Sequence, residues 1–116
     1  MSKEEKYDAT IFDKLIGKRC IVRDNMAGVF FGILLEVRAS GVILGGRPRQ
    51  IHYWDRGGSV AQIANAGIGG KDSRVTAPAE EGTGYAFQAA NIVQILPMSD
   101  IAWERCSEFP AWTGGQ

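Results

Sequence analysis

Residues 51–67 constrain the fold more than any other stretch, because signals for a strand, a turn and a helix follow one another there. An aromatic run ends at Trp54, two glycines follow, and a short segment opens with Ser59 and closes with Gly67. A serine hydroxyl accepts hydrogen bonds from first-turn amides, and glycine adopts the left-handed conformation that ends a helix. The stretch predicts a strand followed by a short helix, which needs packing on the sheet to be stable.

Short strands separated by turn residues make up most of the remaining chain. We expect strands at residues 19–23, 29–37, 42–44, 47–54 and 91–96, with residues 73–77 as a further candidate. Asparagine and glycine between the first two strands suit a tight turn. Gly32, inside the second strand, indicates a bulge or a close backbone approach. The predicted fold class is α+β, an antiparallel meander of about five strands with two or three short helices packed on it.

Two further helices are expected near the ends of the chain. One begins at Ser99 and Asp100 and runs to Cys106, with an apolar side made by Ile101, Ala102 and Trp103. The other ends at Gly17 and has its apolar face at Ile11, Phe12, Leu15 and Ile16.

The domain organisation predicted is an N-terminal arm (1–18), a single α+β domain (19–106) and a C-terminal tail (107–116). The arm is either a frayed tail with one hydrophobic tether or a segment that packs on a neighbouring subunit. The sequence leaves these two alternatives open.

Charge and composition limit the classes of partner. The chain has 116 residues, enough for one domain with a modest core, and its formal net charge is zero. Generic binding to a nucleic-acid polymer needs a dense basic footprint, which so neutral a chain lacks. Residues 45–75 nevertheless hold five basic and two acidic side chains, a local excess of +3. That patch suits a small anion.

The residues that could support metal or catalytic chemistry are few. Cys20, Cys106 and the single His52 have no metal-site spacing, so neither a metal nor a cofactor is expected. A lone histidine without a nucleophile motif is weak support for a catalytic triad, and no phosphate loop or dinucleotide fingerprint occurs. We therefore predict a protein that is not an enzyme. Without a signal peptide or a membrane-length apolar run, we expect it to be reduced and cytoplasmic.

Binding chemistry gathers around residues 51–67. Tyr53, Trp54 or Phe87 would stack a flat ring, Asn91 would read its edge, and the amides at residues 57–59 would face an anion. Arginine forks at positions 47, 49 and 56 would hold phosphate oxygens. The alternative reading is that the rings are core anchors and each arginine is a solvated surface residue.

Four segments resemble a small phage and prophage domain of formerly unknown function. They are residues 27–34 (AGVFFGIL), 49–54 (RQIHYW), 59–67 (SVAQIANAG) and 92–97 (IVQILP). The resemblance spans roughly residues 19–105. Arg56 and Gln94 depart from it, since relatives tend to have glycine and glutamate there.

The domain is also similar to the phage Thoeris anti-defence sponges. That resemblance implies binding, without cleavage, of a nucleotide second messenger: a cyclic ADP-ribose isomer, a cyclic oligonucleotide of the CBASS system, or both. It implies a homo-oligomer, a dimer or an assembly of dimers, in the cytoplasm of an infected bacterial host, with no membrane contact. By residue type and position, the expected ligand-binding residues are Arg23, Ala27, Gly28, Arg49, Tyr53, Trp54, Arg56, Phe87, Asn91 and Arg105.

Two alternatives remain open. One is a protein-interaction module that docks on a host protein through a sheet edge and the aromatic tail residues Phe109 and Trp112. The other is an enzyme that degrades the same nucleotide. The exact ligand, the number of kinds of site and the number of subunits are not determined by the sequence.

Overall fold

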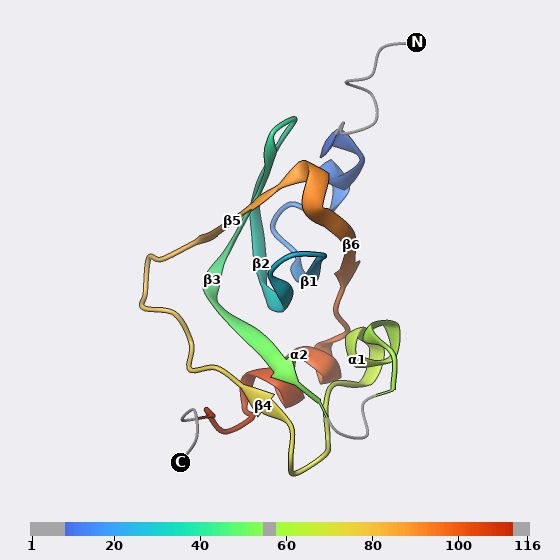
Figure 1. Ribbon diagram of the computed structural model, residues 1–116, viewed down its shortest axis with the longest axis vertical. Coiled ribbons are helices and arrows are strands. Elements are labelled where there is room, and N and C mark those ends of the chain that lie inside the picture. Colours follow the sequence, from blue (N-terminus) through green and yellow to red (C-terminus); the bar gives the residue numbers. More distant parts are fainter. Residues whose placement is uncertain (1–8, 55–57, 113–116) are drawn as a thin grey trace.

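The computed structural model describes residues 9–54 and 58–112, which form an antiparallel sheet with short helices (Figure 1). The strands are β1 (Arg19–Asp24), β2 (Gly28–Arg38), β3 (Gly41–Tyr53), β4 (Arg74–Val75), β5 (Tyr85–Gln88) and β6 (Ile92–Pro97). The helices are α1 (Val60–Ala66) and α2 (Asp100–Ser107), with 3-10 turns η2 (Ala9–Leu15) and η3 (Ala89–Asn91). The α+β antiparallel class is confirmed, with six strands instead of about five.

The sheet order is β4-β3-β2-β1-β6, and β5 pairs with the other half of β3. The 3-10 turn η3 joins the two strands β5 and β6, which lie at opposite edges of the sheet. It is held between the β1–β2 turn and the β2–β3 turn. Ala89 donates its amide to the Ser40 carbonyl over 2.9 Å, and Asn25 donates to the Asn91 carbonyl over 2.9 Å. The sheet is therefore curled, with an inner and an outer face.

Strand β3 is continuous where the sequence predicted two strands, at residues 42–44 and 47–54. The prediction was wrong because Gly45 and Gly46 bend the strand without ending it. Phe31 pairs with Arg49 and Ile33 with Gly45, so residues 46–48 bulge opposite the single Gly32. A Cβ at Gly32 would lie 2.5 Å from the Gly45 carbonyl oxygen, which confirms the close backbone approach expected there.

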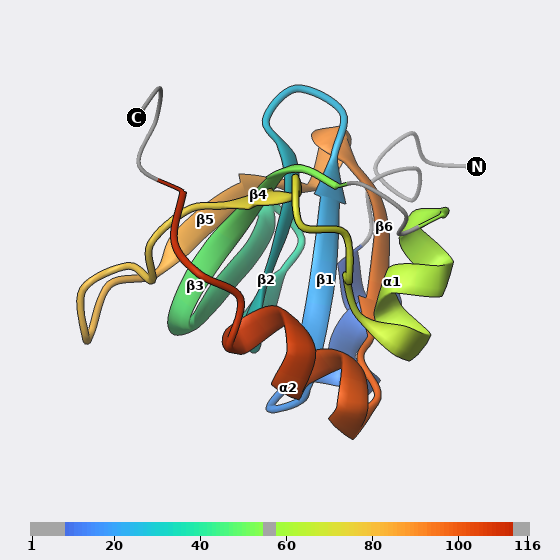
Figure 2. The same ribbon diagram turned by 90° about the horizontal axis from the view of Figure 1, so that it is seen from below.

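Alternate residues of β1 point to opposite sides of the sheet, so the strand contributes apolar side chains to both faces. Each face is covered by other elements. Ile21 belongs to the outer cluster, which α1 and α2 cover from the same side (Figure 2). Cys20 and Val22 belong to the inner cluster, with Phe87 of β5 and with Phe12 and Leu15 of η2 packed on it. The N-terminal segment is thus tethered by two side chains, whereas Ile11 and Ile16 of the predicted apolar face are exposed.

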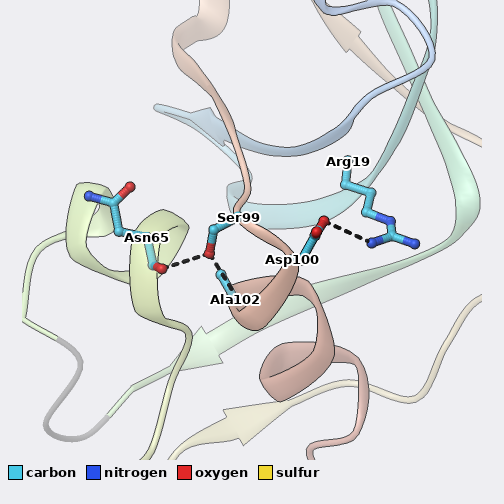
Figure 3. A network of polar contacts seen from close by, with 5 residues as sticks. All are labelled: Arg19, Asn65, Ser99, Asp100 and Ala102. Atoms are coloured by element: carbon cyan, nitrogen blue, oxygen red, sulfur yellow. Dashed lines mark hydrogen bonds and ion pairs between the residues drawn. The ribbon is translucent and has the colours of Figure 1, made fainter.

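The two α-helices begin where the sequence predicted, because their caps are local. Ser59 and Gln62 form a reciprocal capping box on α1, and Gly67 ends it with φ 80°. Ser99 caps α2 by accepting from the Ala102 amide, and it donates to the Asn65 carbonyl over 2.6 Å (Figure 3). One serine thus begins α2 and ties it to α1.

Several smaller expectations are corrected. The buried side of α2 is Ala102 and Cys106, while Ile101 is 44% exposed. Strand β5 was not predicted as a separate strand, and residues 73–77 supply only the two-residue β4. Within residues 9–54 and 58–112, no helix has the length and apolar character needed to cross a bilayer.

Candidate functional site

A surface hollow of about 660 Å³ lies where the end of β3, the strand β4 and the C-terminal tail meet. We call it the Arg74 hollow. It is lined by His52, Tyr53, Lys71, Asp72, Ser73, Arg74 and Trp112. Of the residues expected to bind ligand, it contains Tyr53.

A bulge in β3 brings two neighbouring side chains into this hollow. Ile51 pairs with Val75 and Tyr53 with Arg74, so β3 advances two residues while β4 advances one. Neighbouring side chains of a regular strand point to opposite faces, and the extra residue, His52, breaks that alternation. The bulge therefore lets both His52 and Tyr53 line the hollow.

The tail supplies the third wall. Ala111 forms a parallel bridge with Val75, and Trp112 donates its amide to the Val75 carbonyl over 2.7 Å. This places the Trp112 ring flat against His52, with centroids 4.8 Å apart and planes 9° from parallel. The tail is thus attached to the edge of β4 at this point.

Arg74 gives the hollow its binding chemistry. Its guanidinium carbon lies 5.9 Å from the ring centre of Tyr53 and 5.2 Å from that of Trp112. Both distances are within the range of cation–π attraction. In the part of the chain that the structure describes, no carboxylate pairs with Arg74. Lys71 and Arg74 outnumber Asp72, so the hollow has an excess positive charge beside aromatic rings.

Arg49 has a different role from the one predicted. It is 3% exposed, and its guanidinium donates to the carbonyls of Thr76, Cys106, Ser107 and Phe109 over 2.6, 3.2, 2.9 and 2.9 Å. The last three belong to the end of α2 and the start of the tail, where carbonyls run out of amide donors from the helix; of the three, the Cys106 carbonyl also accepts the Phe109 amide over 3.3 Å. Arg49 is therefore a structural residue and not part of a ligand surface.

The interior around Arg49 also changes the acid–base behaviour of its neighbours. Burial lowers the pKa of Arg49 from its ordinary value. Burial also raises the pKa of the Cys106 thiol, against a smaller lowering from the Ile68 backbone and from Arg49. On the inner face, burial raises the pKa of Cys20 to about 11. Both cysteines are free and protonated near neutral pH.

The other predicted arginines that the structure describes, at positions 23, 47 and 105, do not line the Arg74 hollow. Arg56 lies outside the described residues. Arg105 donates to the Ala66 carbonyl over 2.9 Å at the end of α1. Arg23 is exposed on β1, between Val29 and Gln94 of the neighbouring strands. The predicted convergence of arginines is therefore not found among those the structure describes.

The helix start was also expected to offer free amides to an anion, and this expectation was wrong for Ser59. Its amide donates to Gln62 Oε1 over 2.7 Å, and the Gln62 amide donates back to Ser59 Oγ over 3.3 Å. Trp54 is half-buried, packs on the outer cluster and donates its indole N–H to the Gly58 carbonyl over 2.8 Å. These groups are already used by the fold.

A second hollow, of about 510 Å³, collects three predicted residues, Ala27, Phe87 and Asn91. We call it the Asp24 hollow; its lining also includes Asp24, Met26, Phe30 and Tyr85. Phe87 is 6% exposed, too buried for its ring face to stack a ligand. Gly28 is the first residue of β2, directly after the lining residue Ala27, and has φ 111°.

Arg74 was not among the predicted ligand residues, and Trp112 was predicted in a different role. Arg74 falls in the predicted strand 73–77, but nothing local shows that this strand pairs with Tyr53. Trp112 was expected to belong to a docking tail. The usable signal was the basic excess of residues 45–75, which includes Lys71 and Arg74.

Comparison with known proteins identifies the family but not an activity. The comparison with curated proteins found no match. Residues 17–106, well over half of the chain, match the model of a family described as a domain of unknown function, DUF6948. The chain therefore belongs to the DUF6948 family.

Proposed function

We propose that this protein binds a small phosphorylated ligand with a flat ring, of the nucleotide class, and holds it without cleaving it. The proposed site is the Arg74 hollow. The observation that carries the proposal is the position of the Arg74 guanidinium, over the rings of Tyr53 and Trp112 and without a carboxylate partner in the described chain.

The chemistry of the hollow favours this ligand class. A guanidinium donates in its own plane, so Arg74 can face two rings and still offer N–H groups to phosphate oxygens. Tyr53 is 51% exposed and leaves ring surface for stacking. Lys71 adds a second cation at the rim. A flat ring that carries phosphate would use both kinds of group.

We propose further that the biological role is the one implied by the sequence resemblance. The protein would act as a phage anti-defence sponge that sequesters a cyclic ADP-ribose isomer or a cyclic oligonucleotide. A sponge needs a dissociation constant near the nanomolar range, which corresponds to about 12 kcal/mol. One stacked ring and two cations on an open surface provide less binding free energy than that. A second subunit that covers the hollow would supply the difference, so the proposal includes a homo-oligomer.

The alternative of a docking module receives less support, because its two expected contact rings pack against other parts of the fold. Phe109 packs against the outer core cluster, and Trp112 stacks on His52. Phe109 is therefore largely taken up by the core, whereas Trp112 also lines the Arg74 hollow and stays partly exposed.

The decisive experiment is extraction of ligand from protein purified out of phage-infected cells with an active signalling system, followed by mass spectrometry. We expect an intact nucleotide, released by heat, that rebinds in isothermal titration. Recovery of a cleaved nucleotide would favour the enzyme alternative. Failure to bind cyclic ADP-ribose isomers, cyclic dinucleotides or cyclic trinucleotides would overturn the proposal. Light scattering with and without ligand tests the oligomer separately.

A further inference from the structure

We infer that the Asp24 hollow is a second binding site, and that it takes a compact organic cation such as a quaternary ammonium group. This inference does not depend on the proposed function, because the two hollows share no lining residue. The Asp24 hollow lies between the β1–β2 turn and β5, at the mouth of the curled sheet. Mouths of curled or closed sheets are common ligand sites.

Aromatic rings form a corner in this hollow. Phe30 meets Tyr85 edge to face, with centroids 5.7 Å apart and planes at 81°. Phe30 also meets Phe87 at 5.1 Å and 64°. Phe30 and Tyr85 are only half-buried and pack on the rim of the inner cluster. Rings at steep angles wall a rounded group on two sides, whereas a flat base stacks on one open face.

A fixed carboxylate lines the same hollow as these rings. Asp24 is 7% exposed, and its Oδ1 accepts the amides of Met26 and Ala27 over 2.8 and 2.9 Å. Those two bonds hold the carboxylate in place. The other oxygen, Oδ2, has no hydrogen bond or ion pair with any described residue and is not sealed in the interior. It is free to pair with a cation that enters the hollow.

The charge of the lining selects the sign of the ligand. Asp24 is the only charged residue among those that line this hollow, and Gln88 and Asn91 are neutral amides. A phosphorylated ligand would meet an unbalanced carboxylate there, which is unfavourable. A quaternary ammonium group in this hollow would be bordered by aromatic rings and by a negative charge. This is the combination by which proteins recognise such cations.

The test compares two ligands of the same shape. Choline and its neutral isostere 3,3-dimethylbutan-1-ol are titrated into the full-length protein and followed by NMR, through the amides of Met26 and Ala27 and the ring signals of Phe30 and Tyr85. We expect choline to bind in the millimolar range and the alcohol to bind at least about tenfold more weakly. Sodium chloride at equal concentration controls for ionic strength.

Variants separate charge from packing. Asp24→Asn keeps the oxygen that accepts from the turn amides but removes the charge, so choline affinity should fall about tenfold with the turn intact. Tyr85→Leu should weaken choline binding, and Tyr85→Phe, which keeps the ring, should not. Equal affinity for the two ligands, or no effect of Asp24→Asn, would overturn the inference. So would the absence of choline binding at about 100 mM.

Discussion

Arg49 and Arg74 lie on paired strands next to the same C-terminal tail, yet they do opposite things. Arg49 is buried and donates to three carbonyls of residues 106–109. Arg74 is exposed and faces the ring of Trp112, three residues farther along the chain. The backbone carbonyls at the start of the tail therefore accept hydrogen bonds from the buried Arg49, whereas the ring of Trp112 lines a hollow at the surface.

The comparison separates residues that stabilise the fold from residues available to a ligand. Removing Arg49 would leave the partly buried carbonyls of Thr76, Ser107 and Phe109 without their side-chain donor, which lowers the free energy of unfolding. Removing Arg74 would expose two rings that are already partly in water, so it should change binding and leave stability nearly as it is. Four experiments test this separation.

The largest effect is expected for Arg49→Met. The methionine fills space but donates nothing to four carbonyls, so the free energy of unfolding should fall by about 3 to 5 kcal/mol, measured by urea denaturation. Arg47→Met is the matched control. Arg47 is exposed and makes one hydrogen bond, to the Ala79 carbonyl over 2.9 Å, and its loss should cost less than about 1 kcal/mol. Similar losses in the two variants would remove the distinction between interior and surface arginines.

The next effect is a pH dependence from the buried Cys20 thiol. Burial raises its pKa from 9.0 to about 11. Below pH 9 the thiol is protonated in both the folded and the unfolded state. Between pH 9 and 11 only the unfolded chain loses the proton, so the free energy of unfolding should fall, by about 2 kcal/mol at pH 11.

Comparison with Cys20→Ala isolates this contribution from lysines and tyrosines that titrate in the same range. The variant will be less stable at every pH. The informative quantity is the slope of its unfolding free energy against pH. A slope as steep as that of the parent between pH 9 and 11 would show that Cys20 is not the group responsible.

A tenfold or greater loss of affinity is expected for Arg74→Ala towards the nucleotide recovered by extraction, equivalent to about 1.4 kcal/mol. Its melting temperature should stay close to that of the parent. Arg23→Ala is the control, because Arg23 is an exposed arginine predicted from sequence but absent from the lining of the Arg74 hollow. If Arg23→Ala weakened titration heats more than Arg74→Ala did, the site would have to be placed on the β1 side of the sheet.

The smallest effect is expected for Ser99→Ala. This change removes the cap of α2 and the hydrogen bond to the Asn65 carbonyl (Figure 3), which should cost about 1 kcal/mol of unfolding free energy. Nucleotide affinity should not change. Ser99→Asp, which retains a capping oxygen, should recover part of the loss; weakened nucleotide binding in Ser99→Ala would mean that the helix junction and the hollow are coupled.

The helix starts could be predicted because a cap depends on residues three apart. Ser59 with Gln62 and Ser99 with Ala102 form their contacts within one turn. The bend in β3 could not be predicted in this way. Gly45 and Gly46 indicate a turn when only the local sequence is considered, and only the pairing of β2 on both sides of them shows that the strand continues. Tyr53 was predicted as a ligand residue from its type, and its partner Arg74 depends on a register across 21 residues.

The antiparallel α+β class, the two helix starts and the basic excess in the middle of the chain could all be predicted from the amino-acid sequence alone. These follow from local spacing and residue type. Three outcomes became visible only in the folded structure: Arg49 is buried, Arg74 is exposed over two rings, and Asp24 lines one hollow with Phe30 and Tyr85. Each of those outcomes depends on strand register and on where the tail packs. Such contacts join distant segments and are set by the burial of the whole core.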